Sequence, residues 1–473
     1  MQQSYYRRLG DRVFRVPRIK QWHIPLPTVT TQRAPRRLSP LLLVYGFLGL
    51  ILVGTVLLML PISSKAGQFT HAVDALFTAT SAVCVTGHVV VDTGDYWSGF
   101  GQVVILLLIQ LGGFGFMTSA TLLLLVLGRR IGLRERLLIG ETMSLRRLGG
   151  LVKLVRRIAL FTALAEGIGA VIFSARFWSE YPPATAVWRG VFHSVSSFNN
   201  AGFDLFGGFR SLADFQADAL VVLATAALII LGGISFVVVA DVLAVRRFSR
   251  LALDSKIVLI TSAALLAIGM IVILLTEYSA PDTLGPLSLP QKLLNAFFHS
   301  VTARTAGFST MDIGSIADYS LFLTILLMFV GGAAGSTAGG IKVNTFGMII
   351  ATIWSSLKGK QFAGAFGREF KTQQVNRALT VVMLSLGLVS VAVFVLTLTE
   401  SFTFLRLLFE TVSAFGTVGL STGIVPELSM AGRLIITATM FAGRLGPLAI
   451  ALALIQRQQP ATHRYPEDQI RIG

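Results

Sequence analysis

The chain has 473 residues, of which 53% are hydrophobic and only 13% are charged, and its mean hydropathy is +0.73. A soluble domain carries about 25% charged residues, so this composition excludes an ordinary soluble protein and indicates an integral membrane protein. The net charge of +17 does not indicate nucleic-acid binding, because the basic residues lie between apolar runs rather than in one patch. Cys84 is the only cysteine, which excludes a disulfide framework and a site built from several cysteines.

Eight apolar runs follow a basic, proline-containing segment that covers residues 1–39. Each run is near the length of about 20 residues that a membrane-spanning helix needs. In chain order they cover residues 41–60, 101–127, 158–178, 217–244, 257–278, 320–352, 378–399 and 430–455. The first run is long and no small-residue cleavage site follows it, so it predicts a retained helix rather than a signal peptide.

The basic residues outside the apolar runs lie at the N-terminus, in every second connector and in the tail. The positive-inside rule places such segments in the cytoplasm. The sequence therefore predicts a multi-pass protein with eight spans and with both termini in the cytoplasm.

One stretch recurs four times, each time between the two spans of a successive pair. In every copy a phenylalanine stands ten residues before a glycine, and the copies cover residues 77–87, 192–202, 297–307 and 409–419. Each copy is too short and too polar to cross a bilayer, so the predicted unit is a span, a re-entrant loop and a span. We expect the repeats at residues 40–157, 158–256, 257–377 and 378–456, with a cytoplasmic tail at 457–473. All four loops enter from the same side, and such parallel repeats can surround one axis.

The glycine that ends each copy predicts a path for a dehydrated monovalent cation. Non-helical backbone at membrane depth is tolerated where protein or a water-filled cavity covers it. Glycine adopts positive φ without steric cost, so the carbonyls before it can turn toward an axis and replace an ion's hydration shell. The predicted ion-binding residues are Val85, Thr86, Gly87, Asn200, Ala201, Gly202, Thr305, Ala306, Gly307, Thr417, Val418 and Gly419. The alternative is four tight turns in which glycine serves packing.

The sixth run is interrupted by a Gly-rich segment at residues 331–340. Each interior glycine costs a helix about 1 kcal/mol relative to alanine, so five of them in ten residues make an unbroken helix there implausible, and no other second helix of a repeat has this feature. We interpret the segment as a gate below the ion-binding loops, and the alternative is close helix packing through small residues. Its candidate gate residues are Gly331, Gly332, Gly335, Ser336, Thr337, Gly339 and Gly340.

Arg444 lies inside the last run, where a charge is expensive and normally faces a cavity or a partner. It is the predicted electrostatic barrier of the path, and the alternative is that it caps carbonyls loosened near Pro447. Arg304 is expected to pair beside the path. Three histidines, at positions 88, 193 and 299, lack ligand spacing for a metal, so no metal site is expected beyond the permeant ion.

The loops carry motifs that resemble those of the Ktr/Trk potassium transporter superfamily, which is related to the plant HKT transporters. The motifs are TATSAVCVTG (78–87), SFNNAGF (197–203), ARTAGF (303–308) and SAFGTVGL (413–420). The Trk branch usually has two additional N-terminal spans, whereas no apolar run precedes residue 41 here. The chain is therefore most similar to the membrane subunit of a bacterial Ktr system.

The resemblance implies an all-α integral membrane protein in which four helix–loop–helix repeats surround a pseudo-fourfold pore. It implies gated, channel-like K⁺ uptake through a carbonyl filter, with the Gly-rich segment and Arg444 as the intramembrane gate. It further implies a homodimer in the bacterial inner membrane and a cytosolic, nucleotide-binding regulatory ring of the RCK type. K⁺ would be the permeant ion and Na⁺ a possible activator, and no organic cofactor is expected in this chain.

A coupled transporter and an enzyme are the two other classes of function. A cation-coupled secondary transporter, a K⁺/Na⁺ or K⁺/H⁺ symporter, needs a titratable group in the path, for which Glu166, Asp241 and Glu410 are the acidic candidates. An enzyme is not expected, because the sequence has no nucleophile–base pair, Walker motif or metal-ligand cluster.

Overall fold

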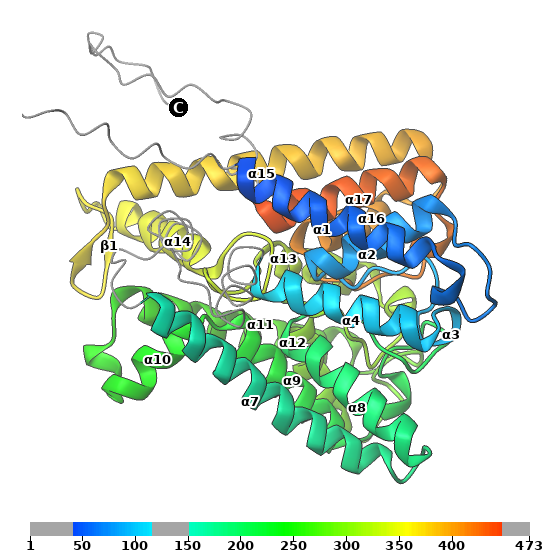
Figure 1. Cartoon of the computed structure of the whole chain (residues 1–473). Coiled ribbons are helices and arrows are strands. Elements are labelled where there is room, and N and C mark those ends of the chain that lie inside the picture. Colours follow the sequence, from blue (N-terminus) through cyan, green and yellow to red (C-terminus); the bar gives the residue numbers. More distant parts are fainter. Residues whose placement is uncertain (1–40, 116–150, 447–473) are drawn as a thin grey trace, which may run out of the picture. The chain divides into compact units, whose positions relative to one another are not determined.

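The computed structural model describes residues 41–115 and 151–446, all of which belong to one compact unit. Four sets of three helices follow one another along this part (Figure 1). The first helices of the sets are α1 (Leu41–Met59), α7 (Leu151–Phe177), α11 (Leu253–Glu277) and α15 (Thr372–Thr399). The second, shorter helices are α2 (Ala72–Cys84), α8 (Pro183–Phe198), α12 (Leu289–Thr302) and α16 (Phe404–Gly416). The third are α4 (Gly99–Phe114), α9 (Ala219–Gly233), α13 (Asp318–Phe329) and α17 (Met430–Leu445).

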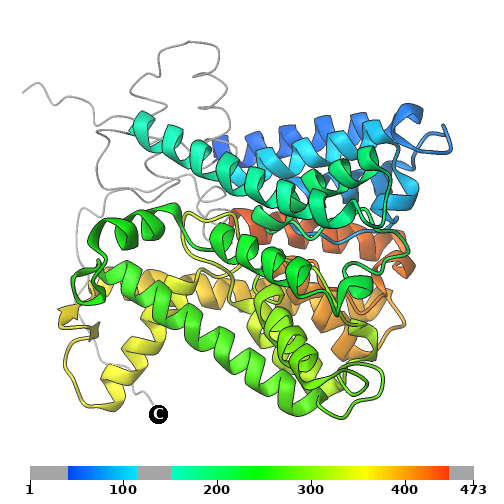
Figure 2. The same cartoon turned by 90° about the horizontal axis from the view of Figure 1, so that it is seen from below.

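The contacts between helices close the four sets into a cycle, which Figures 1 and 2 show from two sides. Within each set the first helix contacts the other two. Between sets, the third helix of one contacts the short helix of the next: α4 on α8, α9 on α12, α13 on α16 and α17 back on α2. Because the last contact returns to the first set, the short helices surround a common centre. This arrangement is consistent with four parallel repeats around one axis.

Side-chain caps fix where three of the third helices begin. The hydroxyl of Ser98 accepts from the backbone N–H of Gly101, and that of Ser429 accepts from the N–H of Gly432. Asp218 caps α9 in the same way through its carboxylate. Such caps satisfy N–H groups that the first helical turn leaves without partners. They set the point at which the chain turns from each loop into the following helix.

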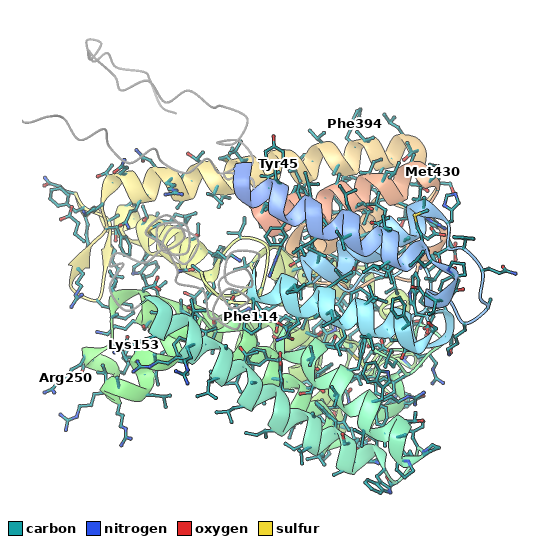
Figure 3. All side chains as sticks on the ribbon, in the orientation of Figure 1. Tyr45, Phe114, Lys153, Arg250, Phe394 and Met430 are labelled. Carbon is teal, nitrogen blue, oxygen red and sulfur yellow. The ribbon has the colours of Figure 1, made fainter. Side chains whose placement is uncertain are left out.

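The outer surface of the helices is apolar. Three described helices are long and apolar enough to cross a membrane, namely α7 over Val155–Phe177, α11 and α15, and the bent pair α9 and α10 would make a fourth. Leu275 of α11 is 73% exposed, and Phe394 of α15, labelled in Figure 3, projects from the outer side of its helix. An outer surface with many large, exposed apolar side chains is typical of one that contacts lipid or protein. The count of eight spans stays a prediction.

The fourth predicted span is not one helix. It consists of α9 and α10 (Phe236–Val245), which meet at a bend of 95°. Ser235 begins α10, and its side chain accepts from the N–H of Val237. The sixth span is also broken, because α13 ends at Phe329 and α14 (Val343–Leu357) begins after the Gly-rich segment. The break in the sixth run was predicted from its glycines, whereas the fourth run was predicted as one span and its break was not foreseen. The missed signal was Gly232 and Gly233 shortly before the capping Ser235.

Short elements complete the described part. They are α3 (Thr93–Tyr96), η1 (Pro61–Ser63), η2 (Ala213–Phe215), η3 (Phe248–Arg250), η4 (Ile313–Ser315), η5 (Val425–Glu427) and the antiparallel strands β1 (Gly364–Ala365) and β2 (Arg368–Glu369). The predicted terminal segments, 1–39 and 457–473, lie outside the described residues, as do the ends of the second and eighth apolar runs.

Candidate ion pathway

The four glycines that end the repeated stretches converge on one place. They line a single cavity of about 380 Å³. A Cβ atom built on each glycine would collide with the carbonyl oxygen that precedes the glycine of the next repeat. Gly87 meets Ala201, Gly202 meets Ala306, Gly307 meets Val418 and Gly419 meets Thr86. The contacts run from repeat to repeat and return to the first, so the glycines form a closed ring, which we call the glycine ring.

The backbone before each glycine has the same unusual conformation in all four repeats. The residues two positions earlier have positive φ: 57° at Val85, 58° at Asn200, 74° at Thr305 and 49° at Thr417. Non-glycine residues seldom adopt this region, and β-branched ones are genuine outliers there. The glycines of the ring also have positive φ, between 70° and 92°, as the sequence predicted. The strain two positions earlier was not predicted, because valine and threonine give no sign of it.

Hydrogen bonds from the short helices hold these strained loops. The hydroxyl of Ser81 accepts from the N–H of Gly87 at 3.1 Å. Ser413 accepts from Gly419 at the same distance in the fourth repeat. Thr302 in the third repeat instead donates to the carbonyl of Phe308 at 2.7 Å. Residues in sparsely populated conformations persist only when their surroundings over-determine them, and these bonds supply part of that constraint.

The Gly-rich segment, residues 331–340, packs directly against two of the strained positions. A Cβ atom on Gly331 would lie 3.1 Å from the side chain of Thr305. One on Gly339 would overlap the side chain of Thr417. The segment can therefore pass this close to the loops of repeats 3 and 4 only because it lacks side chains at these positions.

The break in α9 supplies the partners that hold the Gly-rich segment. Thr337 donates to the carbonyl of Gly232 through its N–H at 3.3 Å and its hydroxyl at 3.0 Å. The N–H of Ala333 donates to the carbonyl of Gly233 at 2.9 Å. These carbonyls are free to accept because a helix end leaves its last C=O groups without intrahelical partners. The end of α9 and the Gly-rich segment after α13 thus satisfy each other's backbone hydrogen bonds.

Arg444 connects the Gly-rich segment to a different repeat. It lies in the last turn of α17, and its guanidinium donates to the carbonyl of Thr337. The same group donates to the carbonyl of Gly112 at 2.5 Å and lies 3.5 Å from that of Gly113, at the end of α4. It does cap carbonyls, as the alternative interpretation held, and those that it reaches among the described residues belong to two other elements; Pro447 itself lies outside the described residues.

Two further basic residues bond to the backbone beside the path. Arg304 donates to the backbone and hydroxyl oxygens of Ser262 at 3.3 Å and 3.2 Å, and to the carbonyl of Gly331 at 3.3 Å. The prediction that Arg304 pairs structurally is consistent with these contacts. Lys342 donates to the carbonyl of Ala338 at 2.5 Å. Both side chains therefore brace the two ends of the Gly-rich segment.

The three acidic residues considered for coupled transport are each engaged by hydrogen bonds. Glu166 accepts from the side chain of Asn199 at 2.9 Å. Asp241 accepts from the N–H of Ala252 and the hydroxyl of Ser255, at the start of α11. Glu410 accepts from three donors of the chain that follows Gly419. Within the described residues, none of these three carboxylates lines the cavity at the glycine ring.

The three histidines differ in the repeat that their ring nitrogens contact. His193 and His299 each contact a threonine of the third helix in their own repeat, Thr225 and Thr324, at 2.9 Å. His88 instead contacts Ser413 of the fourth repeat, also at 2.9 Å. In the part of the chain that the structure describes, no group of three or more histidine, cysteine or acidic residues is placed to hold a metal ion.

The cavity carries negative charge at its mouth. Asp92, Asp204 and Glu427 line it together with the glycine ring. Asp204 lies two residues after Gly202, and its carboxylate accepts from the N–H of Phe206 at 3.0 Å. Burial raises the pKa of Asp204 to about 7, although the Phe206 bond opposes the shift. The charge at the mouth is therefore sensitive to pH near neutrality, and this feature could not be predicted from the sequence because it depends on how deeply the folded chain buries Asp204.

The sequence model of the family described as TrkH, cation transport protein, matches residues 37–465. The chain belongs to this family of cation transport proteins. Relatives of this TrkH-family chain include the Ktr system potassium uptake protein B of Bacillus subtilis, which is 43% identical over 434 residues that cover 92% of this chain and 96% of the relative. The potassium/sodium uptake protein NtpJ of Enterococcus hirae is 40% identical over 453 residues, which cover 94% of this chain and all of the relative.

A solved structure resembles the fold of this TrkH-family chain. The crystal structure of the potassium transporter TrkH from Vibrio parahaemolyticus superposes with a TM-score of 0.70. The match covers 92% of this chain and 87% of the other, at 19% sequence identity. At this identity the likeness bears on the fold, and it agrees with the predicted all-α membrane architecture.

Proposed function

We propose that this chain is the ion-translocating membrane subunit of a Ktr-type system for K⁺ uptake. The observation that carries the proposal is the glycine ring, in which each glycine abuts the carbonyl before the next. Rings of backbone carbonyls can replace the hydration shell of K⁺. The relatives named for potassium uptake, which match nearly the whole chain, add support. The filter is formed by residues 85–87, 200–202, 305–307 and 417–419.

The Gly-rich segment and Arg444 form the gate of this pathway. The segment packs against the filter positions Thr305 and Thr417. It is tied to α9 through Gly232 and to α17 through Arg444. A segment without regular structure, held by a few hydrogen bonds, can exchange between two arrangements more readily than a packed helix. Release of these bonds is the step that opens the path.

Movement of the ion is passive and driven by the membrane potential. An inside-negative potential draws a cation inward by about 2.3 kcal/mol per 100 mV. Coupling to protons or Na⁺ would require a titratable or ion-binding group in the path. Glu166, Asp241 and Glu410 are instead engaged by neighbouring donors and stand outside the cavity lining. The carboxylates that do line the cavity, Asp92, Asp204 and Glu427, lie at its mouth rather than in the glycine ring, which favours a channel-like mechanism over symport.

The resemblance to Ktr systems implies the wider assembly that we propose. The chain acts in a bacterial cell membrane with both termini in the cytoplasm, as a homodimer that binds a cytosolic nucleotide-binding ring. Na⁺ acts as an activator of K⁺ uptake; a role for Na⁺ is in keeping with the name of the potassium/sodium uptake relative. Four glycines in the ring favour K⁺ as the preferred permeant ion.

Uptake of radioactive Rb⁺ into liposomes tests this function. Liposomes that contain the purified chain are loaded with K⁺, and external K⁺ or Na⁺ is added as competitor. We expect uptake that external K⁺ blocks and Na⁺ blocks only weakly. Uptake that requires a proton or Na⁺ gradient in the same liposomes would establish the symport alternative instead. Protein-free liposomes serve as the control for leakage.

A further inference from the structure

Two buried side chains face each other behind the junction of repeats 1 and 4. His88 follows Gly87 of the glycine ring, and Glu410 lies on α16 of the fourth repeat. Each residue is only 1% exposed. The Nδ1 atom of His88 and the Oε2 atom of Glu410 are 3.8 Å apart, just beyond hydrogen-bond distance, and neither has a hydrogen-bond partner in the described part of the chain. An unpaired buried polar atom is costly, so two that face each other require an explanation.

Hydrogen-bond accounting at Ser413 fixes the roles of the His88 nitrogens. The Ser413 hydroxyl donates its single proton to the carbonyl of Leu420 at 2.7 Å and accepts from the N–H of Gly419 at 3.1 Å. Its 2.9 Å contact with the Nε2 atom of His88 must then be one in which the histidine donates. A neutral histidine that carries its proton on Nε2 presents a bare lone pair at Nδ1, and that lone pair faces Glu410.

An ionised Glu410 would leave two acceptors face to face. One proton placed between Nδ1 and Oε2 would replace this repulsion by attraction and draw the two atoms from 3.8 Å into a charge-assisted or neutral hydrogen bond, whichever of the two groups carries it. The remaining carboxylate oxygen, Oε1, is already fully engaged. It accepts from the hydroxyl of Ser421 at 3.0 Å and from the N–H and hydroxyl of Thr422 at 2.7 Å and 2.9 Å.

The bonds of this pair reach both sides of the repeat junction. Through Ser421 and Thr422, Glu410 holds the chain just after Gly419. Through Ser413, His88 joins the loop of repeat 1 to that of repeat 4. His193 and His299 make no such link, because each bonds a threonine of its own repeat. The junction of repeats 1 and 4 is therefore braced in a way that the other described histidines do not reproduce.

The charged side chains on neighbouring elements do not stabilise an ionised Glu410 in place of this proton. Arg406 lies one turn before Glu410 on α16, and its guanidinium is directed to the carbonyl of Gly314 at 3.5 Å. The remaining charged side chains of the helices against α16 are engaged elsewhere or exposed. Glu400 accepts from Ser429, Arg433 pairs with Asp74, Arg444 bonds Thr337 and Gly112, and Asp318 and Arg377 are exposed.

We propose that Glu410 and His88 bind one proton between them, and that this shared proton fixes the backbone after Gly87 and Gly419 and so helps to select K⁺ over Na⁺. The inference rests on the proposed function, because selectivity is its readout. Loss of the proton would leave a carboxylate against a lone pair, and the two loops would move apart. A ring that is no longer held at the size of K⁺ discriminates less against the smaller ion.

The test measures the ratio of K⁺ to Na⁺ competition against Rb⁺ uptake, in liposomes that contain the full chain, between about pH 6 and pH 9. For the unmodified chain we expect the ratio to fall about fivefold as the pH rises, the factor that corresponds to one lost net hydrogen bond. In Glu410→Gln the amide donates to His88 permanently while its oxygen still accepts, so the ratio should stay high at every pH.

His299→Gln is the matched control, because it changes a buried histidine that bonds only within its own repeat, and it should keep the pH dependence of the unmodified chain. If Glu410→Gln does not yield folded protein, His88→Leu replaces it and should give a low ratio at every pH. A ratio that is constant with pH in the unmodified chain, or that changes equally in Glu410→Gln, would overturn the proposal. Absence of K⁺-sensitive uptake in both the unmodified chain and Arg444→Ala, whose gate should be open, would instead refute the proposed function.

Discussion

Replacement of Arg444 by alanine should increase cation uptake. The guanidinium holds the Gly-rich segment through Thr337 and the end of α4 through Gly112. If opening moves the segment away from Arg444 while α4 stays in place, only the Thr337 bond differs between the closed and open states. Only such differential contacts shift a conformational equilibrium.

The size of the effect follows from that one bond. A hydrogen bond to a charged group contributes about 1.5 to 3 kcal/mol net. Its loss should raise the open-to-closed ratio about 10- to 150-fold, and uptake should increase until the open state predominates. The positive charge adjacent to the cation path is removed as well, which acts in the same direction.

The assay is Rb⁺ uptake into liposomes with equal amounts of folded protein, compared among three variants. Arg444→Lys keeps the positive charge but loses the planar fork that reaches two carbonyls at once. High uptake in this variant would identify the bridge as the barrier, whereas low uptake would identify the charge. Arg433→Ala is the matched control on α17, because Arg433 pairs with Asp74 and does not contact the Gly-rich segment. Uptake by Arg444→Ala that is no higher than that of the unmodified chain would refute the gate assignment.

Three further predictions concern the gate, the glycine ring and the mouth. Deletion of Gly332–Ala338 removes the donors to the broken end of α9, so Rb⁺ uptake should rise; unchanged uptake by the folded variant would contradict the gate. In Gly419→Ser the new Cβ would collide with the carbonyl of Thr86 and sit at a φ of 92°, so competition assays should show a lower K⁺/Na⁺ ratio, and an unaltered ratio would argue against a filter here. Asp204 is ionised above its pKa of about 7, so uptake should fall as external pH drops from about pH 8 to pH 6. Asp204→Asn should give uptake about fivefold lower, the effect of ~1 kcal/mol of attraction between unit charges in water, and without this pH dependence; a variant that keeps the acid sensitivity would show that another group is responsible.

The candidate site divides into parts that the sequence could and could not predict. The four glycines were predictable, because each repeat ends on one at the same spacing and positive φ there carries no steric cost. The positive φ of Val85 and Thr417 was not predictable, since β-branched residues disfavour it. The break after α9 was missed because an apolar run with two glycines is common in membrane helices. The break in the sixth run was predictable because five glycines lie within ten residues there.

By itself, the sequence determined the membrane class, the four repeats and the positions of the loops that end on glycine. These follow from local properties, namely hydropathy, repeat spacing and the conformational freedom of glycine, which each segment carries wherever it lies. Only the tertiary structure decided which residues meet across repeats: Arg444 with Thr337 and Gly112, and His88 with Glu410. Such contacts depend on how four similar but unequal units close into a cycle, and each unit's own sequence carries no record of its neighbour's side chains.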